Sequence, residues 1–230
     1  MLIQFIKEKL KSNRNFIIAI IGLVSVRWSI ADHYRVPSGS MKPTIQIGDH
    51  ILVNKMAFDF KLPFTDIVLA HNHDPKRGDI VVFKSPKDPS INLIKRLIAI
   101  PGDQVEITNG VVKINGQETL IHDKRPIKLI TENQQYGRLE TLWFEEKIDQ
   151  KIITVQRLPM LFRPEHRQFN IPAGKYLFMG DNRDNSADGR FFGLVDQQAL
   201  KGKALNVTIS VAFKDYLPVV NWGRFGKKLI

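Results

Sequence analysis

The sequence predicts a mainly β fold of antiparallel strands, and three observations predict it. Four Gly-Asp pairs punctuate the 230 residues, and this pair favours a tight turn because glycine bends freely and aspartate bonds its own backbone. Short β-branched or apolar runs follow the first three pairs, at 51–53, 80–83 and 105–108. Asn109-Gly110 separates two such runs by two residues, which indicates a hairpin and therefore antiparallel pairing.

An apolar segment near the N-terminus is predicted to be a single transmembrane helix over residues 16–31. It contains one charge, Arg27, and at ~1.5 Å per residue it reaches about 24 Å, slightly less than a ~30 Å hydrocarbon core. Four basic residues and one acid lie in residues 1–15, so we expect that segment to be cytoplasmic and residues 32–230 to lie outside. The net charge of +11 permits binding to nucleic acid or to an anionic membrane surface, and the N-terminal segment favours the membrane.

Two alternatives remain for this apolar segment. Ser29-Ile30-Ala31 is a small-x-small site that is typical of a cleavable signal peptide, although Arg27 and Trp28 lie where such a site is small and uncharged. A buried helix of a soluble domain is disfavoured, because the segment is apolar on all faces and follows a basic flank. A permanent anchor is the preferred interpretation.

The rest of the chain is expected to continue as strands. Residues 111–114 complete the hairpin, and Asn115-Gly116 marks a second turn. Further strands are predicted over Lys175–Met179 and over 204–213, which is rich in β-branched residues. Residues 118–169 are charged, with scattered aromatics and weak periodicity, which indicates a separate lobe. The segment 222–228 is interpreted as a basic surface segment.

One serine and one lysine could together form a catalytic pair. Ser40 lies in a tight Pro-Ser-Gly-Ser-Met turn, and Lys95 lies in the apolar run 91–100, which contains no Asp or Glu. Burial there would lower the lysine pKa, so that a neutral amine could take the proton of a serine hydroxyl. Each residue also has a plain interpretation, as an edge-strand lysine that limits aggregation and as a polar turn serine. On a strand, Lys95 shares its face with Leu93, Leu97 and Ala99.

Four separated boxes resemble, in the same order, the signature boxes of bacterial type I signal peptidases. They are residues 37–44, 76–83, 94–96 together with 101–103, and 179–190, which read PSGSMKPT, KRGDIVVF, IKR with PGD, and MGDNRDNSADGR. One departure is visible, because Gly189 stands where the family commonly has serine. It bears on local packing rather than on chemistry.

The resemblance implies a membrane-bound serine endopeptidase that removes signal peptides from exported preproteins with a Ser-Lys dyad. It also implies an antiparallel β-sheet catalytic core with an inserted β-rich cap lobe, here residues 104–172, away from the active site. Ser40 matches the nucleophile and Lys95 the general base, while Ser38 and the Ser40 amide match the oxyanion hole. In the last box, Ser186 matches a serine that orients the lysine amine, and the bracing residues are Asp181, Arg183, Asp188 and Arg190.

Substrate recognition in this family resembles strand addition, in which an extended peptide places small side chains in apolar pockets. The matching positions, each with an alternative as a core residue, are Val36, Pro37, Met41, Ile45, Ile51, Val82, Leu93 and Ile94.

The resemblance further implies no cofactor, no metal, no nucleic acid and no obligate protein partner. The expected partners are preprotein signal peptides and the lipid bilayer. His71 and His73 lie in a polar loop and are interpreted as solvent-exposed residues rather than as metal ligands. The expected location is the inner membrane, single-pass, with the catalytic domain on the periplasmic side.

Four other interpretations compete. A histidine triad is disfavoured, because the six histidines are scattered and no Gly-x-Ser-x-Gly elbow is present. Self-cleaving repressors share the Ser-Lys fold but need an N-terminal DNA-binding domain, where this chain has its apolar segment. A relative that matures pilus or conjugation proteins would have similar boxes and different pockets. A basic membrane-anchored binding module would explain the charge, but it would need neither Ser40 nor Lys95.

Overall fold

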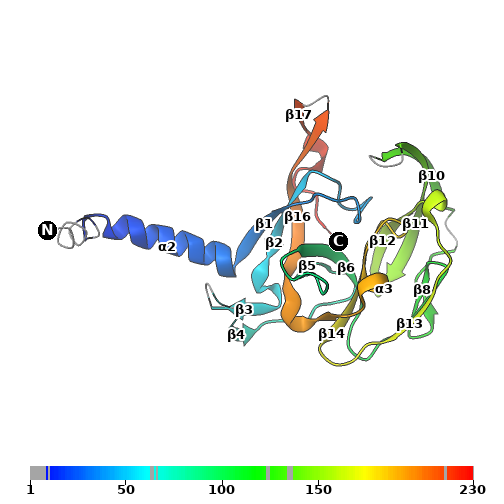
Figure 1. The fold of residues 1–230 in the computed structure, drawn as a ribbon, viewed down its shortest axis with the longest axis horizontal. Coiled ribbons are helices and arrows are strands. Elements are labelled where there is room, and N and C mark those ends of the chain that lie inside the picture. The colour runs from blue at the N-terminus through cyan, green and yellow to red at the C-terminus, as the bar shows by residue number, and fades with distance from the viewer. Residues whose placement is uncertain are drawn as a thin grey trace.

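The computed structural model describes residue 9 and residues 11–62, 65, 67–122, 125–133, 137–214 and 217–229. Its largest element is an eight-stranded antiparallel sheet, from which a helix projects on one side, while two smaller sheets lie on the other (Figure 1). The prediction of a mainly β fold with antiparallel strands is confirmed.

Helix α2 (Arg14–Ser29) is a 16-residue rod that extends away from the sheets (Figure 1). Several of its apolar side chains are open to the surroundings, with Phe16 67% and Leu23 73% exposed. Within the described part of the chain, none of the helices combines the length and the apolarity that a membrane crossing requires. The helix ends before residue 31, the predicted boundary, because Ala31 already pairs with Asn54 in the main sheet.

The main sheet gathers strands from both ends of the chain. Strand β16 is its longest member, and it pairs with β2 on one side and with β5 on the other through several register shifts. The order is β1 (Ala31–Arg35), β2 (Asp49–Asn54), β16 (Leu200–Lys214), β5 (Ile80–Lys84), β6 (Asn92–Ala99), β14 (Lys175–Met179) and β15 (Val195–Asp196), and β17 (Leu217–Val220) pairs with β16.

Between β6 and β14 the chain forms the two smaller sheets. One sheet has the order β13 (His166–Asn170), β7 (Gln104–Thr108), β8 (Val111–Ile114) and β9 (Gln117–Glu118). The other is the three-stranded sheet of β10 (Ile127–Asn133), β11 (Gly137–Ile148) and β12 (Lys151–Arg157). Short elements complete the fold: the hairpin β3 (Asp59–Lys61) and β4 (Val68–His71), helix α3 (Gly189–Phe192), and the single turns η1 (Lys55–Ala57), η2 (Pro159–Leu161), η3 (Gln197–Ala199) and η4 (Trp222–Arg224).

The predicted turns form as their sequences indicate. Asn109 and Gly110 both adopt positive φ, at 49° and 76°, which is the conformation of a two-residue hairpin turn. In the first three Gly-Asp pairs, the aspartate accepts a hydrogen bond from the backbone N–H three residues earlier, at distances of 2.8, 3.1 and 2.9 Å for Asp49, Asp79 and Asp103. The predicted role of these carboxylates in closing the turns is confirmed.

Strand β6, which contains Lys95, departs from strict alternation near its end. Leu93 and Leu97 pack in one core cluster, as their predicted common face requires. Ala99 does not join them, because it lies in a different cluster together with its neighbour Ile98. The register between β6 and β14 shifts at this point, and such a β-bulge re-aims the side chains that follow it. The prediction that Ala99 shares the face of Leu93 and Leu97 is therefore wrong, whereas the common face of Leu93 and Leu97 is confirmed.

Candidate active site

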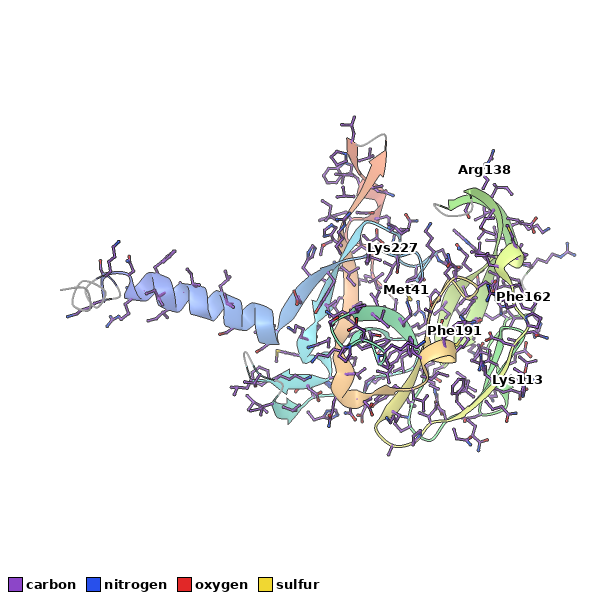
Figure 2. The ribbon with its side chains drawn as sticks, viewed as in Figure 1. Met41, Lys113, Arg138, Phe162, Phe191 and Lys227 are labelled. Atoms are coloured by element: carbon purple, nitrogen blue, oxygen red, sulfur yellow. The ribbon has the colours of Figure 1, made fainter. Side chains whose placement is uncertain are left out.

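Ser40 lies on a turn that leaves β1 and returns to β2. Val36 N–H donates to Asp49 O at 2.8 Å, and Gly48 N–H donates to Val36 O at 2.9 Å, so the two ends of the turn are tied together. Met41, in the interior of the body (Figure 2), is fully buried and anchors the turn in the core. Ser40 itself is 8% exposed, so little solvent reaches its hydroxyl.

Lys95 contacts Ser40 directly. Its Nζ atom lies 2.5 Å from Ser40 Oγ, across 55 residues of sequence, and the lysine is 3% exposed. Burial lowers the pKa of Lys95 from 10.5 to about 8, against the opposing charges of Asp188 and Asp181. A group with this pKa is partly neutral near neutral pH and can accept a proton from the serine hydroxyl.

The two carboxylates near Lys95 each have an arginine partner. Asp181 accepts two hydrogen bonds from Arg96, both at 2.8 Å, and Asp188 accepts from Arg190 Nε at 2.9 Å. Burial alone would raise the pKa of Asp188, but hydrogen bonds and the charge of Arg190 hold it below its ordinary value. Because both carboxylates are compensated by arginine, their attraction for a protonated Lys95 is reduced.

The segment 180–188, which follows β14, holds the Ser40 turn in place. Asn182 N–H donates to Ser40 O, and Asn182 Nδ2 donates to Gly39 O, both at 3.0 Å. Gly180 packs so closely that a Cβ atom there would lie 2.4 Å from Ser40 O. Glycine is required at this position because any side chain would displace the Ser40 turn.

The two other serines of the predicted site lie close to Ser40. Ser38 is exposed, and its Oγ atom is 3.4 Å from Ser40 Oγ. Ser186 is 9% exposed, and its Oγ atom has no hydrogen bond of ordinary geometry among the described residues. The Ser186 hydroxyl nevertheless helps to lower the pKa of Asp188. The oxyanion role of Ser38 and the orienting role of Ser186 stay predictions.

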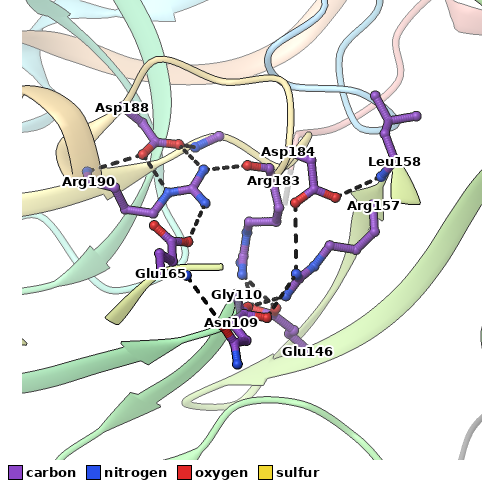
Figure 3. A network of polar contacts seen from close by, with 11 residues as sticks. Asn109, Gly110, Glu146, Arg157, Leu158, Glu165, Arg183, Asp184, Asp188 and Arg190 are labelled. Carbon is purple, nitrogen blue, oxygen red and sulfur yellow. Dashed lines mark hydrogen bonds and ion pairs between the residues drawn. The ribbon is translucent and has the colours of Figure 1, made fainter. Parts of the chain in front are cut away.

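Arg183 ties the same segment to the three-stranded sheet, and Arg190 ties it to Glu165, just before β13 (Figure 3). Arg183 donates to both carboxylate oxygens of Glu146, on β11, at 2.6 Å each. Arg190 donates to Glu165 Oε1 at 3.0 Å and to Arg183 O at 2.5 Å. The three-stranded sheet, which lies within the predicted cap region, therefore touches the segment that supports Ser40, and a cap lobe away from the active site stays a prediction.

The eight apolar positions predicted to bind substrate divide into two groups. Five are almost completely buried members of one core cluster: Val36, Met41, Ile45, Ile51 and Val82. The other three retain solvent exposure: Pro37, Leu93 and Ile94. Contact with substrate stays a prediction for all eight, and the core alternative describes the packing of the first five.

Gly189, the departure from the family pattern, has a structural reason. A Cβ atom there would lie 2.6 Å from Leu177 Cδ1 and 2.8 Å from Phe178 O. The first turn of α3 thus rests directly on β14, and the side chain that the family commonly carries has no room in this packing.

Several residues that hold the site together were not predicted. Asn182 fixes the Ser40 turn, Glu146 pairs with Arg183, and Arg96 pairs with Asp181 while also donating to Gly78 O at 2.8 Å. A signal for Arg96 existed, because an arginine in a run without acids must find a carboxylate elsewhere in the chain. Glu146 carried no such signal among the many charges of residues 118–169.

A buried amine in contact with a serine hydroxyl, on a β framework, is the arrangement that a serine hydrolase with an amine in place of histidine requires. Comparison with known proteins identifies the family. Residues 9–209 match the family described as signal peptidase, peptidase S26.

Two curated relatives share most of the chain. Signal peptidase I of Pseudomonas aeruginosa is 36% identical over 225 residues, which cover 93% of this chain and 77% of the relative. Signal peptidase I of Pseudomonas fluorescens is 32% identical over 229 residues, with the same two coverages of 93% and 77%. A solved signal peptidase I from Enterococcus faecalis V583 is 28% identical, covers 57% of this chain and 97% of its own, and has a TM-score of 0.35. The chain therefore belongs to the signal peptidase family, peptidase S26, and is a peptidase of that family.

Proposed function

We propose that this peptidase cleaves signal peptides from exported preproteins, with Ser40 as nucleophile and neutral Lys95 as general base. The observation that carries the proposal is the 2.5 Å contact between Lys95 Nζ and Ser40 Oγ in a site where burial lowers the lysine pKa. The names of the relatives support the substrate class.

The chemistry follows from this pair. Ser40 Oγ attacks the scissile carbonyl carbon while its proton passes to Lys95 Nζ. The oxyanion that forms would accept hydrogen bonds from Ser38 Oγ and Ser40 N–H. The Lys95 ammonium then donates its proton to the leaving nitrogen as the C–N bond breaks, and water activated by Lys95 hydrolyses the acyl-enzyme.

Two strand edges near Ser40 support binding of an extended peptide. Strand β14 pairs with β6 from Arg96 to Ala99. On that side, residues 92–95 have no pairing strand among the described residues. Strand β1 forms the outer edge of the main sheet and leads directly into Pro37 and Ser38. A peptide that added to these edges would pass Ser40, with Pro37, Leu93 and Ile94 within reach of its side chains.

Helix α2 is proposed to anchor the chain once in the inner membrane, with the body on the periplasmic side. Exposed apolar residues along the helix, such as Phe16, Ile18 and Leu23, lack a protein surface to cover them in the described structure. Four basic residues in 1–15 favour a cytoplasmic N-terminus. Residues 104–172 are proposed to be the inserted cap lobe of the family.

The decisive experiment measures cleavage of a purified preprotein by the full chain in detergent. Ser40→Ala should abolish cleavage, whereas Ser90→Ala, a matched change at an exposed serine, should leave it unchanged. Far-UV circular dichroism checks that both variants are folded. Persistent cleavage by folded Ser40→Ala would exclude the mechanism. If the protein were only a binding module, neither the unmodified chain nor the variant would cleave the preprotein.

A further inference from the structure

Glu146 is a buried acid in a part of the chain to which no role in the reaction is assigned. It lies on β11 and is 2% exposed, and its two oxygens accept from Arg183 Nη1 and Nη2 at 2.6 Å each (Figure 3). The Arg183 side chain is itself fully buried, and its Nε atom has no hydrogen-bond partner among the described residues. Glu146 thus supplies the counter-charge for a guanidinium that cannot reach water.

A second guanidinium makes that counter-charge more important. Burial and the charge of Arg183 both lower the pKa of Arg157, while Asp184 and Glu146 act in the opposite direction. Glu146 therefore stands between two mutually repelling arginines, Arg157 of β12 and Arg183 of the segment 180–188. Without its charge, the two elements would repel each other across their contact.

The contact between β12 and this segment also includes the backbone. Gln156 N–H donates to Asp181 O at 2.7 Å, and Arg183 N–H donates to Gln156 O at 2.9 Å. Asp184 accepts from Leu158 N–H at 2.8 Å. The three-stranded sheet is therefore a second support for the segment, in addition to the Arg96–Asp181 pair of the main sheet.

From Arg183 the contacts lead to both members of the dyad. Its neighbour Asn182 bonds the carbonyls of Gly39 and Ser40. Its own carbonyl accepts from Arg190, whose partner Asp188 bonds Gly180 N–H at 3.0 Å and is a charge that acts on Lys95. A shift of Arg183 would move the groups that fix the hydroxyl and bury the amine.

We propose that Glu146 is a positioning residue for the Ser40-Lys95 dyad, and that the three-stranded sheet thereby takes part in setting the geometry of cleavage. The inference rests on the proposed function. Glu146 acts through Arg183 and the segment 180–188, because the charges that act directly on Lys95 are Asp188 and Asp181.

Glu146→Gln tests this proposal in the full chain with a preprotein substrate. We expect kcat to fall by about ten- to a hundredfold, since a displacement of ~1 Å remote from the chemistry can cost this much. KM should stay near its original value, because the edges of β1 and β6 are untouched. The pH midpoint of kcat should rise from about 8 toward 10.5, since a displaced segment admits water to Lys95.

Two further variants isolate the effect. Glu140→Gln makes the same change on the same strand, at a residue whose side chain is 50% exposed, and should leave kcat and the midpoint unchanged. Glu146→Asp retains a carboxylate on β11, and it should return the midpoint toward about 8 even if Glu146→Gln folds poorly. Rates are referred to the folded fraction from circular dichroism.

A purely structural role predicts a different result. If Glu146→Gln loses activity only in proportion to its folded fraction, with the original midpoint, the proposal is wrong. A kcat equal to that of Glu140→Gln would also overturn it. Ser40→Ala, assayed in parallel, separates this outcome from a failure of the proposed function, because residual cleavage by that variant would mean that the dyad itself is misassigned.

Discussion

Lys95 and Arg96 are adjacent cations on β6, both almost fully buried, yet the structure gives them opposite partners. Arg96 donates twice to the Asp181 carboxylate, whereas Lys95 donates to the Ser40 hydroxyl. A carboxylate partner stabilises a charge, and a hydroxyl partner leaves the burial of the amine largely uncompensated. Neighbouring positions on two faces of one strand thus provide a fixed ion pair for support and an amine that can lose its proton.

The first prediction concerns pH. Because the pKa of Lys95 is lowered to about 8, the neutral base is scarce below this pH and dominant above it. Activity should therefore rise with pH and reach half of its maximum near pH 8, rather than near the 10.5 of an ordinary lysine. Initial rates of preprotein cleavage across pH 6–10 measure this midpoint. A flat profile over this range would point to a different base.

Lys95→Arg provides the matching substitution. Guanidinium keeps its proton throughout this pH range, so the variant should be inactive at every pH even though the positive charge is retained. Lys128→Arg is the control, because that lysine belongs to β10 and its side chain is 70% exposed. Restored activity at high pH in Lys95→Arg would contradict a deprotonated base.

The second prediction concerns the buried Arg96–Asp181 pair. Asp181→Ala leaves a guanidinium that is 1% exposed without its carboxylate, and breaking a buried pair in this way costs ~3–5 kcal/mol. Urea unfolding should show a lower midpoint by a corresponding amount. The double variant Arg96→Met with Asp181→Leu should recover much of this stability, since both charges are removed. If the single variant is as stable as the unmodified chain, the pair does not support the fold.

Much of the fold was predictable because its turns are encoded locally. The Gly-Asp pairs and Asn109-Gly110 determine backbone bends within a few residues, and β-branched runs between them become strands. The bulge that re-aims Ala99 was not predictable, because it depends on the register of β14, which lies far away in the sequence.

The candidate site was predictable only in part. The resemblance indicated Ser40 and Lys95, but the pairing of Glu146 with Arg183 depends on how two distant segments meet. The segment 222–228 is exposed, as the sequence predicts, except at Arg224. Arg224 is 6% exposed, donates to Asp49, and reaches Thr44 O at 3.0 Å, because a carboxylate partner offsets the cost of burial.

The third prediction concerns Gly189. Glycine-to-serine at this position would introduce a Cβ atom 2.8 Å from Phe178 O, which belongs to the backbone of β14 and cannot move aside easily. Overpacking of this kind costs ~1–3 kcal/mol, so Gly189→Ser should lower the urea midpoint even though it restores the residue that the family commonly has. Gly223→Ser is the matched control, because a Cβ atom there meets nothing closer than 3.5 Å. Equal midpoints for the two variants would show that α3 can shift to accommodate a side chain.

The last prediction concerns the topology of the proposed membrane anchor. The 16 residues of α2 reach about 24 Å, so flanking residues of the chain must lie within the interface if the helix crosses a ~30 Å core. With the basic N-terminal flank in the cytoplasm, β1 would begin at the outer surface and Ser40 would follow within a few residues of the bilayer, where a signal peptide's cleavage site emerges. Protease added to intact spheroplasts should then digest the body while a cytoplasmic marker protein stays intact. If the body is protected until the membrane is opened, the topology is inverted. If mass spectrometry finds a mature chain that begins at Asp32, the apolar segment is a cleaved signal peptide and not a permanent anchor.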